Sequence, residues 1–156
     1  MERTAETTSV EREITIAASP ETVWEFLVDP DKARRWWGES VTFDARPGGA
    51  YRIEVIPDHV ARGEFVEVDR PHRLVYTWGW EPSGDGANPV PPGSSTIEVQ
   101  LEAVGDVTVL RFTHGDLPSA EAADSHAKGW DHYLERLVIA AAGGDPGPDP
   151  WAAGEM

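Results

Sequence analysis

The most informative stretch of the chain is SPETVWEFLVDPDKARRWWG, residues 19–38. Ser19 can cap a helix that carries Pro20 at its first position. The residue before a proline avoids the α region, so Asp29-Pro30 ends this helix and starts a second, shorter one. The apolar residues that recur at helical spacing on one face of the first helix are Val23, Trp24, Phe26 and Leu27.

Two tryptophans, Trp36 and Trp37, stand side by side where the second helix ends. Adjacent side chains point in different directions, so we expect that the two rings do not both enter one core. At least one of them is then expected to line an edge or a cavity.

Alternating apolar and polar residues predict seven strands around these helices. They cover residues 10–17, 41–44, 51–55, 62–69, 73–80, 97–101 and 107–114. Short turns join most of them, which favours an antiparallel sheet. In the strand over residues 73–80, the side chains expected on one face are Leu74, Tyr76, Trp78 and Trp80.

A long helix is predicted over residues 119–142, and Gly143-Gly144 ends it. Its apolar stripe, at steps of three and four residues, consists of His126, Trp130, Tyr133, Leu134, Leu137 and Ala141. This stripe has to be buried against another element, and the inner face of the sheet is the available partner. We expect Trp130 at the centre of the contact, with Gly129 beside it permitting close approach.

The predicted fold class is therefore α+β: a curved antiparallel sheet of about seven strands around a long C-terminal helix, with two short helices after the first strand. We expect one domain over residues 10–142, after a flexible N-terminus (1–9) and before a disordered, Gly/Pro-rich tail (143–156). Residues 81–94 are rich in glycine and proline and lack periodicity, which predicts a long mobile loop.

Three motifs in this order resemble the START-like superfamily (SRPBCC, helix-grip fold). They are residues 19–38, GEFVEVDRPHRLVYTW at 63–78 and GWDHYLERL at 129–137. The closest similarity is to its branch of activator of heat-shock-protein-ninety ATPase homologues, and it covers residues 10–142. The resemblance implies the helix-grip fold and an apolar cavity between the sheet and the C-terminal helix.

Composition excludes several classes of partner. The chain has 156 residues, 28 acidic and 13 basic side chains and a net charge of −15 at pH 7. Such a charge repels nucleic-acid phosphates and anionic membranes, so we expect no nucleic acid and no membrane as partners. The longest apolar run, residues 137–142, is too short to span a bilayer, and the N-terminus does not resemble a signal peptide. We expect a cytoplasmic protein.

The chemistry of the side chains is equally restrictive. The chain has no cysteine, which excludes disulfides, thiolate nucleophiles and Cys-ligated metals. His126 and His132 are six residues apart on the long helix, or about 120° in projection, which prevents them from sharing a metal. No pair of acids and no Ser–His–acid arrangement indicates a catalytic group. We predict no metal and no cofactor, and enzyme activity is left open.

An apolar pocket is predicted from the residues that share the apolar strand faces or the helix stripe, and from Trp37, because the paired tryptophans leave the second helix toward the sheet. The predicted ligand-binding residues are Trp37, Tyr51, Phe65, Tyr76, Trp78, Phe112, His114, His126 and Trp130. For each of the two histidines, a hydrogen-bonded, half-buried position without a ligand is the alternative.

The favoured function is binding of a small apolar, aromatic or lipid-like molecule in this pocket. The resemblance leaves two alternatives open. One is a co-chaperone-like protein-interaction domain, with a chaperone or a second copy of the chain as partner. The other is a polyketide-cyclase-like enzyme that uses the same cavity. Inward-pointing polar groups would favour catalysis, and a dry cavity would favour binding.

Overall fold

The computed structural model describes residues 9–38, 40–57, 59–81 and 90–151. Within these residues, seven strands and three helices follow one another in the predicted order. The elements are β1 (Val10–Ile16), α1 (Pro20–Val28), α2 (Pro30–Ala33), β2 (Ser40–Phe43), β3 (Ala50–Ile56), β4 (His59–Asp69), β5 (Arg73–Trp78), β6 (Ser95–Val104), β7 (Val107–Gly115) and α3 (Ala120–Ala141). The α+β helix-grip prediction is confirmed. None of the described helices is long and apolar enough to cross a membrane.

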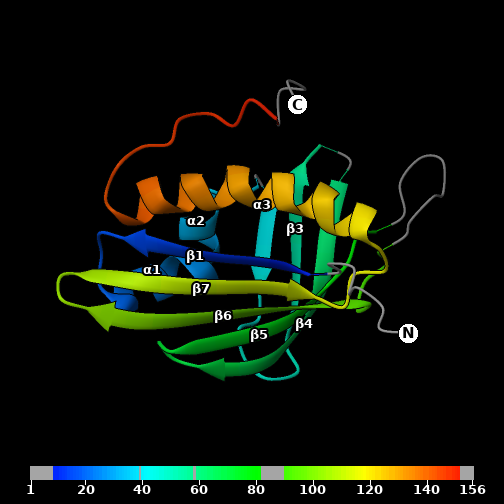
Figure 1. Ribbon diagram of the computed structural model, residues 1–156, viewed down its shortest axis with the longest axis horizontal. Coiled ribbons are helices and arrows are strands. Elements are labelled where there is room, and N and C mark those ends of the chain that lie inside the picture. The colour runs from blue at the N-terminus through cyan, green and yellow to red at the C-terminus, as the bar shows by residue number, and fades with distance from the viewer. Residues whose placement is uncertain (1–8, 39, 58, 82–89, 152–156) are drawn as a thin grey trace, which may run out of the picture.

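The strands form one antiparallel sheet in the order β1-β7-β6-β5-β4-β3-β2. β1 and β7 come from opposite ends of the chain and pair with Val10 opposite His114. Figure 1 shows α3 lying across one face of the curved sheet, with the residues after it turning back along the helix. In β3, Tyr51 and Ile53 point toward that face and are buried. Arg52, between them in the sequence, points to the opposite face and is exposed. The core therefore lies between the sheet and α3.

The capping signals in residues 19–38 are confirmed. Ser19 Oγ accepts a hydrogen bond from the backbone N–H of Thr22 at 3.2 Å, and Pro20 begins α1. Asp29 ends α1, and its carboxylate accepts a hydrogen bond from the backbone N–H of Asp31 at 2.9 Å to open α2. Local signals alone therefore place these two helices.

The expectation that Trp36 and Trp37 cannot share one core is wrong. They are 2% and 4% exposed, and their rings stack with centroids 4.8 Å apart. Trp36 Nε1 donates to the carbonyl of Phe26 in α1 at 2.9 Å, while the ring of Trp37 lies against Trp78 and Trp130. The chain turns directly after α2, and this turn lets adjacent rings stack instead of diverging as they do on a strand.

The C-terminal segment also differs from the prediction. α3 ends at Ala141, and Gly143-Gly144 terminates it as expected: Gly143 has a φ of 95°, and Gly144 N–H donates to the carbonyl of Ile139 at 2.8 Å. Residues 145–151 then pack back on α3, so the expected disorder does not hold for residues 143–151. Residues 1–8, 82–89 and 152–156 lie outside the described residues, and with them most of the predicted flexible N-terminus and mobile loop.

Gly129 is not a site of close approach. A Cβ built there meets no described atom within 4 Å outside its own helical turn. We therefore expect Gly129→Ala to raise the free energy of unfolding by about 1 kcal/mol, because alanine has the higher helix propensity. Urea denaturation followed by circular dichroism measures this change. A loss of stability would contradict it and would restore the close-approach interpretation.

Candidate functional site

The nine predicted site residues come together in one aromatic cluster between the sheet and α3. They come from β3, β4, β5, β7, α3 and the connection between α2 and β2. The centroid of each ring lies within 5.7 Å of another member. Eight of the nine are at most 7% exposed, and His126 is half-buried. Strand alternation and the helix stripe therefore predict the inward direction of eight of these side chains, and the exit of the second helix toward the sheet predicts that of Trp37. Their contact with a ligand remains a prediction.

Trp78 of β5 lies at the centre of the aromatic cluster. Its ring centroid is 5.2 Å from that of Trp130, 5.8 Å from Trp37 and 5.7 Å from His114. Tyr51 lies nearly parallel to Trp78, at 6.5 Å and 26°. Offset-stacked and tilted rings of this kind are the arrangements that aromatic side chains prefer.

Two tyrosines of the sheet, Tyr51 and Tyr76, are buried together with their hydroxyl groups. The rings of Tyr51 and Tyr76 are 5.2 Å apart, and that of Phe65 lies 5.7 Å from Tyr51. The phenol of Tyr51 donates to the carbonyl of Thr77 at 2.5 Å. Burial raises the pKa of both tyrosines, and the proximity of Tyr76 adds to the effect on Tyr51. Both phenols are therefore uncharged at neutral pH.

His114 of β7 is fully buried and held in one neutral tautomer. Ser95 Oγ donates to the carbonyl of Trp78 at 2.9 Å, so it accepts a hydrogen bond from His114 Nε2, also at 2.9 Å. An indole nitrogen can only donate, and Trp130 Nε1 donates to His114 Nδ1 at 3.0 Å. Burial, reinforced by the nearby His126, lowers the pKa of His114 from 6.5 to about 3. The ring is neutral, and both of its nitrogens are used.

His126 of α3 repeats this arrangement with Trp80. Its Nδ1 donates to the carbonyl of Ala122 at 2.8 Å, and its Nε2 accepts a hydrogen bond from Trp80 Nε1 at 3.0 Å. Burial lowers the pKa of His126, against the opposing effect of the bond to Ala122. The rings of His114 and His126 lie 5.0 Å apart. Two neutral histidines, each accepting an indole N–H, therefore stand side by side in the cluster.

Two residues of this network are absent from the predicted site. Trp80 has the strand parity of Tyr76 and Trp78, and Ser95 has that of the buried Ile97. The alternation that selected the other residues could therefore have found both. Which polar atoms meet depends on the pairing of separate strands with α3, and no local pattern reports that.

Ser95 and His114 do not form a nucleophile–base pair. In such a pair the serine hydroxyl donates to the histidine, which a third group orients. Here the hydroxyl proton goes to a backbone carbonyl, and the histidine donates to the serine. Among the described residues, no group of three or more His, Cys, Asp or Glu side chains could hold a metal ion. The cluster offers apolar surface and hydrogen bonds rather than an activated nucleophile.

One polar atom at the centre of the cluster has no hydrogen-bond partner among the described residues. Trp78 Nε1 is buried and makes no hydrogen bond within the part of the chain that the structure describes. Leaving a buried donor unpaired costs about 1–3 kcal/mol. Folded proteins rarely keep such a group without a specific reason, and an acceptor supplied by a bound molecule is one.

The chain is similar to known proteins over most of its length. The family model described as Activator of Hsp90 ATPase homolog 1-like protein matches residues 17–142. An AHSA1-like protein of Rhizobium etli, solved in solution by NMR, is 48% identical over 92% of this chain and 87% of its own, with a TM-score of 0.72. A comparison with curated proteins gives no match.

Two more distant structures share the fold. DynU16, a protein of the dynemicin biosynthetic locus, is 20% identical over 89% of this chain and 49% of its own, with a TM-score of 0.74. An HSP90 activator of Plasmodium falciparum is 21% identical over 83% of this chain and 93% of its own, with a TM-score of 0.67. At these identities the likeness concerns the fold alone.

Proposed function

Because this chain belongs to the Activator of Hsp90 ATPase homolog 1-like family and has an aromatic cluster between its sheet and α3, we propose that it binds a small apolar molecule in this cluster. The ligand is neutral, flat or lipid-like, and it carries a hydrogen-bond acceptor. Its affinity comes mainly from buried apolar area, at about 25 cal/mol per Å² before the cost of ordering.

The observation that carries this proposal is the unpaired indole N–H of Trp78. It is a buried donor at the centre of the cluster, with no partner among the described residues. A carbonyl, ether or phenol oxygen on a ligand would accept this hydrogen bond and remove the cost of leaving it unmade. A single well-placed polar group in an apolar surrounding is typical of small-molecule sites.

The electrostatics of the cluster favour a neutral ligand. The histidines and tyrosines that line it have pKa values that leave them uncharged at neutral pH. The charged pairs of the described residues, such as Arg73 with Glu67 at 3.0 Å, have partly exposed side chains. An ionised ligand inside the cluster would lose its hydration without gaining a counter-charge, which is strongly unfavourable.

Binding is favoured over a cyclase-like reaction because neither histidine of the aromatic cluster has a free lone pair among its contacts with the described residues. The lone pairs of His114 Nδ1 and His126 Nε2 already accept indole N–H groups. A general base needs its lone pair directed at the proton that it removes. The polar groups that point inward therefore serve the packing of the cluster.

Binding is also favoured over the alternative of a co-chaperone-like protein-interaction domain. An exposed apolar patch would favour such a role. The large apolar side chains exposed on the described surface are Val66, Val104 and Ile139, which lie on three different elements. β4 and β6 are separated by β5, so these side chains do not follow adjacent strands.

A pair of fluorescent probes tests the proposal. Prodan is a neutral naphthalene with a ketone acceptor, and dimethylaminonaphthalene is the same ring system without the ketone. We expect Trp78→Phe, which keeps a ring and removes the N–H, to weaken prodan binding about two- to tenfold more than binding of the ketone-free probe, since a net hydrogen bond contributes about 0.5–1.5 kcal/mol. Fluorescence titration measures both affinities, and circular dichroism checks that the variant is folded.

The two probes separate the ways in which the proposal can fail. Equal weakening of both would mean that Trp78 contributes ring contact only. Lack of saturable binding of either probe to the unmodified protein would contradict the proposed function and would favour the protein-contact role.

A further inference from the structure

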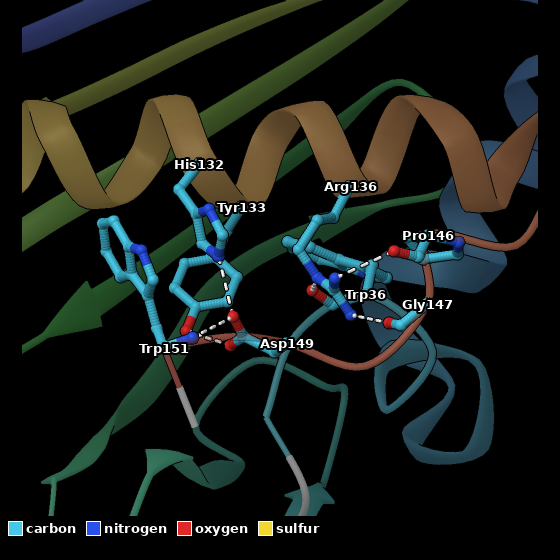
Figure 2. A network of polar contacts seen from close by, with 8 residues as sticks. All are labelled: Trp36, His132, Tyr133, Arg136, Pro146, Gly147, Asp149 and Trp151. Carbon is cyan, nitrogen blue, oxygen red and sulfur yellow. Dashed lines mark hydrogen bonds and ion pairs between the residues drawn. The ribbon is translucent and has the colours of Figure 1, made fainter. Parts of the chain in front are cut away.

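The segment after α3 is bound to the helix by a network of polar contacts. Figure 2 shows residues 146–151 running beside α3, with side chains of His132, Tyr133 and Arg136 directed at it. No part of the proposed ligand site uses this network. Its position, its two anchors and its composition together point to a role in access to the aromatic cluster.

The first anchor is Arg136. Its guanidinium donates to the carbonyls of Pro146 at 3.3 Å and Gly147 at 2.8 Å. The same group donates through Nε to the carbonyl of Trp36 at 3.1 Å. Arg136 of α3 therefore connects the C-terminal segment to the connection between α2 and β2. The Trp36 carbonyl to which it donates belongs to the peptide bond between Trp36 and Trp37.

The second anchor is Asp149. Its carboxylate accepts hydrogen bonds from Tyr133 Oη at 2.5 Å and from His132 Nε2 at 2.8 Å. Although burial opposes ionisation, these bonds and one from the backbone of Trp151 keep the pKa of Asp149 below its usual value. The ring of Trp151 stacks on His132, with centroids 4.1 Å apart and planes 5° from parallel.

These anchors lie on one flank of α3. On the opposite flank, Asp131 pairs with Arg12 of β1 at 2.6 Å and closes the helix against that edge of the sheet. Arg136 is five residues further on, about 140° around the helix, and faces the connection between α2 and β2. Arg136 therefore joins the segment 145–151 to the connection between α2 and β2 at Trp36, the residue before Trp37 of the aromatic cluster.

The composition of the segment suits it to dock and undock. Pro146, Pro148 and Pro150 occupy every second position, and each restricts φ to about −65°. Gly147 has a φ of 77°, a left-handed backbone conformation that residues with a side chain rarely adopt. A chain with few accessible conformations loses little entropy when it docks. A segment held by two polar anchors is nonetheless easily released compared with a core element.

We infer that residues 145–151 form a strap that closes the entrance to the aromatic cluster on this flank, and that opening of the strap sets the rate at which a ligand enters and leaves. This inference rests on the proposed function, because it requires a ligand in the cluster. The strap contacts α3 and the Trp36 carbonyl rather than the cluster itself, so its loss changes both rates and leaves the affinity nearly the same.

Stopped-flow fluorescence with prodan tests the strap in the full chain. Asp149→Ala removes the acceptor for both Tyr133 and His132. We expect the association and dissociation rate constants to rise together by at least about tenfold, the smallest effect produced by loss of one charge-assisted hydrogen bond. The matched control is Asp131→Ala, which removes an ion pair of the same helix on its opposite flank and should leave both rates unchanged.

Docking of the strap is followed separately by NMR, through contacts between the rings of Tyr133 and Trp151, whose centroids are 5.8 Å apart. These contacts should be lost in Asp149→Ala and kept in Asp131→Ala. Lost contacts with unchanged rates would overturn the strap and leave the proposed function standing. Contacts that persist in Asp149→Ala would show that Asp149 is not an anchor, which also overturns it. If prodan binds neither the unmodified protein nor the variants, the proposed function and the strap both fail.

Discussion

Trp130→Ala is expected to lower the free energy of unfolding by about 3–5 kcal/mol, the range for removal of a large aromatic ring from a packed core. The ring is 4% exposed and lies 4.6 Å from Phe112 and 5.2 Å from Trp78, centroid to centroid. Its loss also removes the N–H donated to His114 Nδ1 at 3.0 Å. Urea denaturation followed by far-ultraviolet circular dichroism gives the free energy directly.

Ile139→Ala is the matched control for this change. Ile139 lies on the same helix, but its side chain is 38% exposed, so we expect a loss well below that of Trp130→Ala. If the two variants lose similar stability, Trp130 is not part of a packed core. A small loss at Trp130 combined with weaker prodan binding would mean that the ring lines a space that a ligand fills.

The second large effect is a loss of stability in acid that depends on His114. Its pKa in the folded protein is about 3, below the value of 6.5 for an unperturbed histidine, because of burial and the nearby His126. As the pH falls below 6.5, His114 binds a proton in the unfolded chain but stays unprotonated in the folded protein. The free energy of unfolding therefore decreases. At pH 5 the contribution of this one residue is a loss of about 2 kcal/mol relative to neutral pH.

His114→Gln isolates this effect. Glutamine can still donate to Ser95 and accept from Trp130, but it does not titrate. Denaturation measured from pH 7 to pH 4.5 should show a shallower loss of stability in His114→Gln than in the unmodified protein. His72→Gln, at an exposed turn, serves as the control and should follow the unmodified protein. Parallel curves for all three would show that His114 takes up its proton in the folded state as readily as in the unfolded chain.

Local patterns were sufficient for much of the fold. The cap at Ser19 and the break at Asp29-Pro30 lie where the structure has them. Alternation along the strands identified the inward residues of β3 and β5, and the stripe on α3 identified Trp130. These signals are reliable because the repeat of a strand or a helix dictates which side chains share a face, whatever the rest of the chain does.

The candidate site could be predicted as a set of residues but not as a network. Trp80 and Ser95 have the parity of their neighbours, yet their hydrogen bonds to His126 and His114 join elements distant in sequence. That Trp78 Nε1 has no hydrogen-bond partner among the described residues likewise depends on everything packed around it. Hydrogen bonding depends on positions to within a few tenths of an ångström, which periodicity does not specify.

The sequence by itself therefore determined the order of the elements, the face that each one buries and the identity of the nine clustered side chains. Only the tertiary structure decided that Trp36 and Trp37 stack in one core and that residues 145–151 dock on α3. The reason is physical: the direction of a side chain along a helix or strand follows from local backbone geometry, whereas the docking of a turn or a tail depends on surfaces that exist only after distant elements have assembled. A proline-rich segment is read as disordered from its composition, and it is ordered here because Arg136, Tyr133 and His132 meet it with donors.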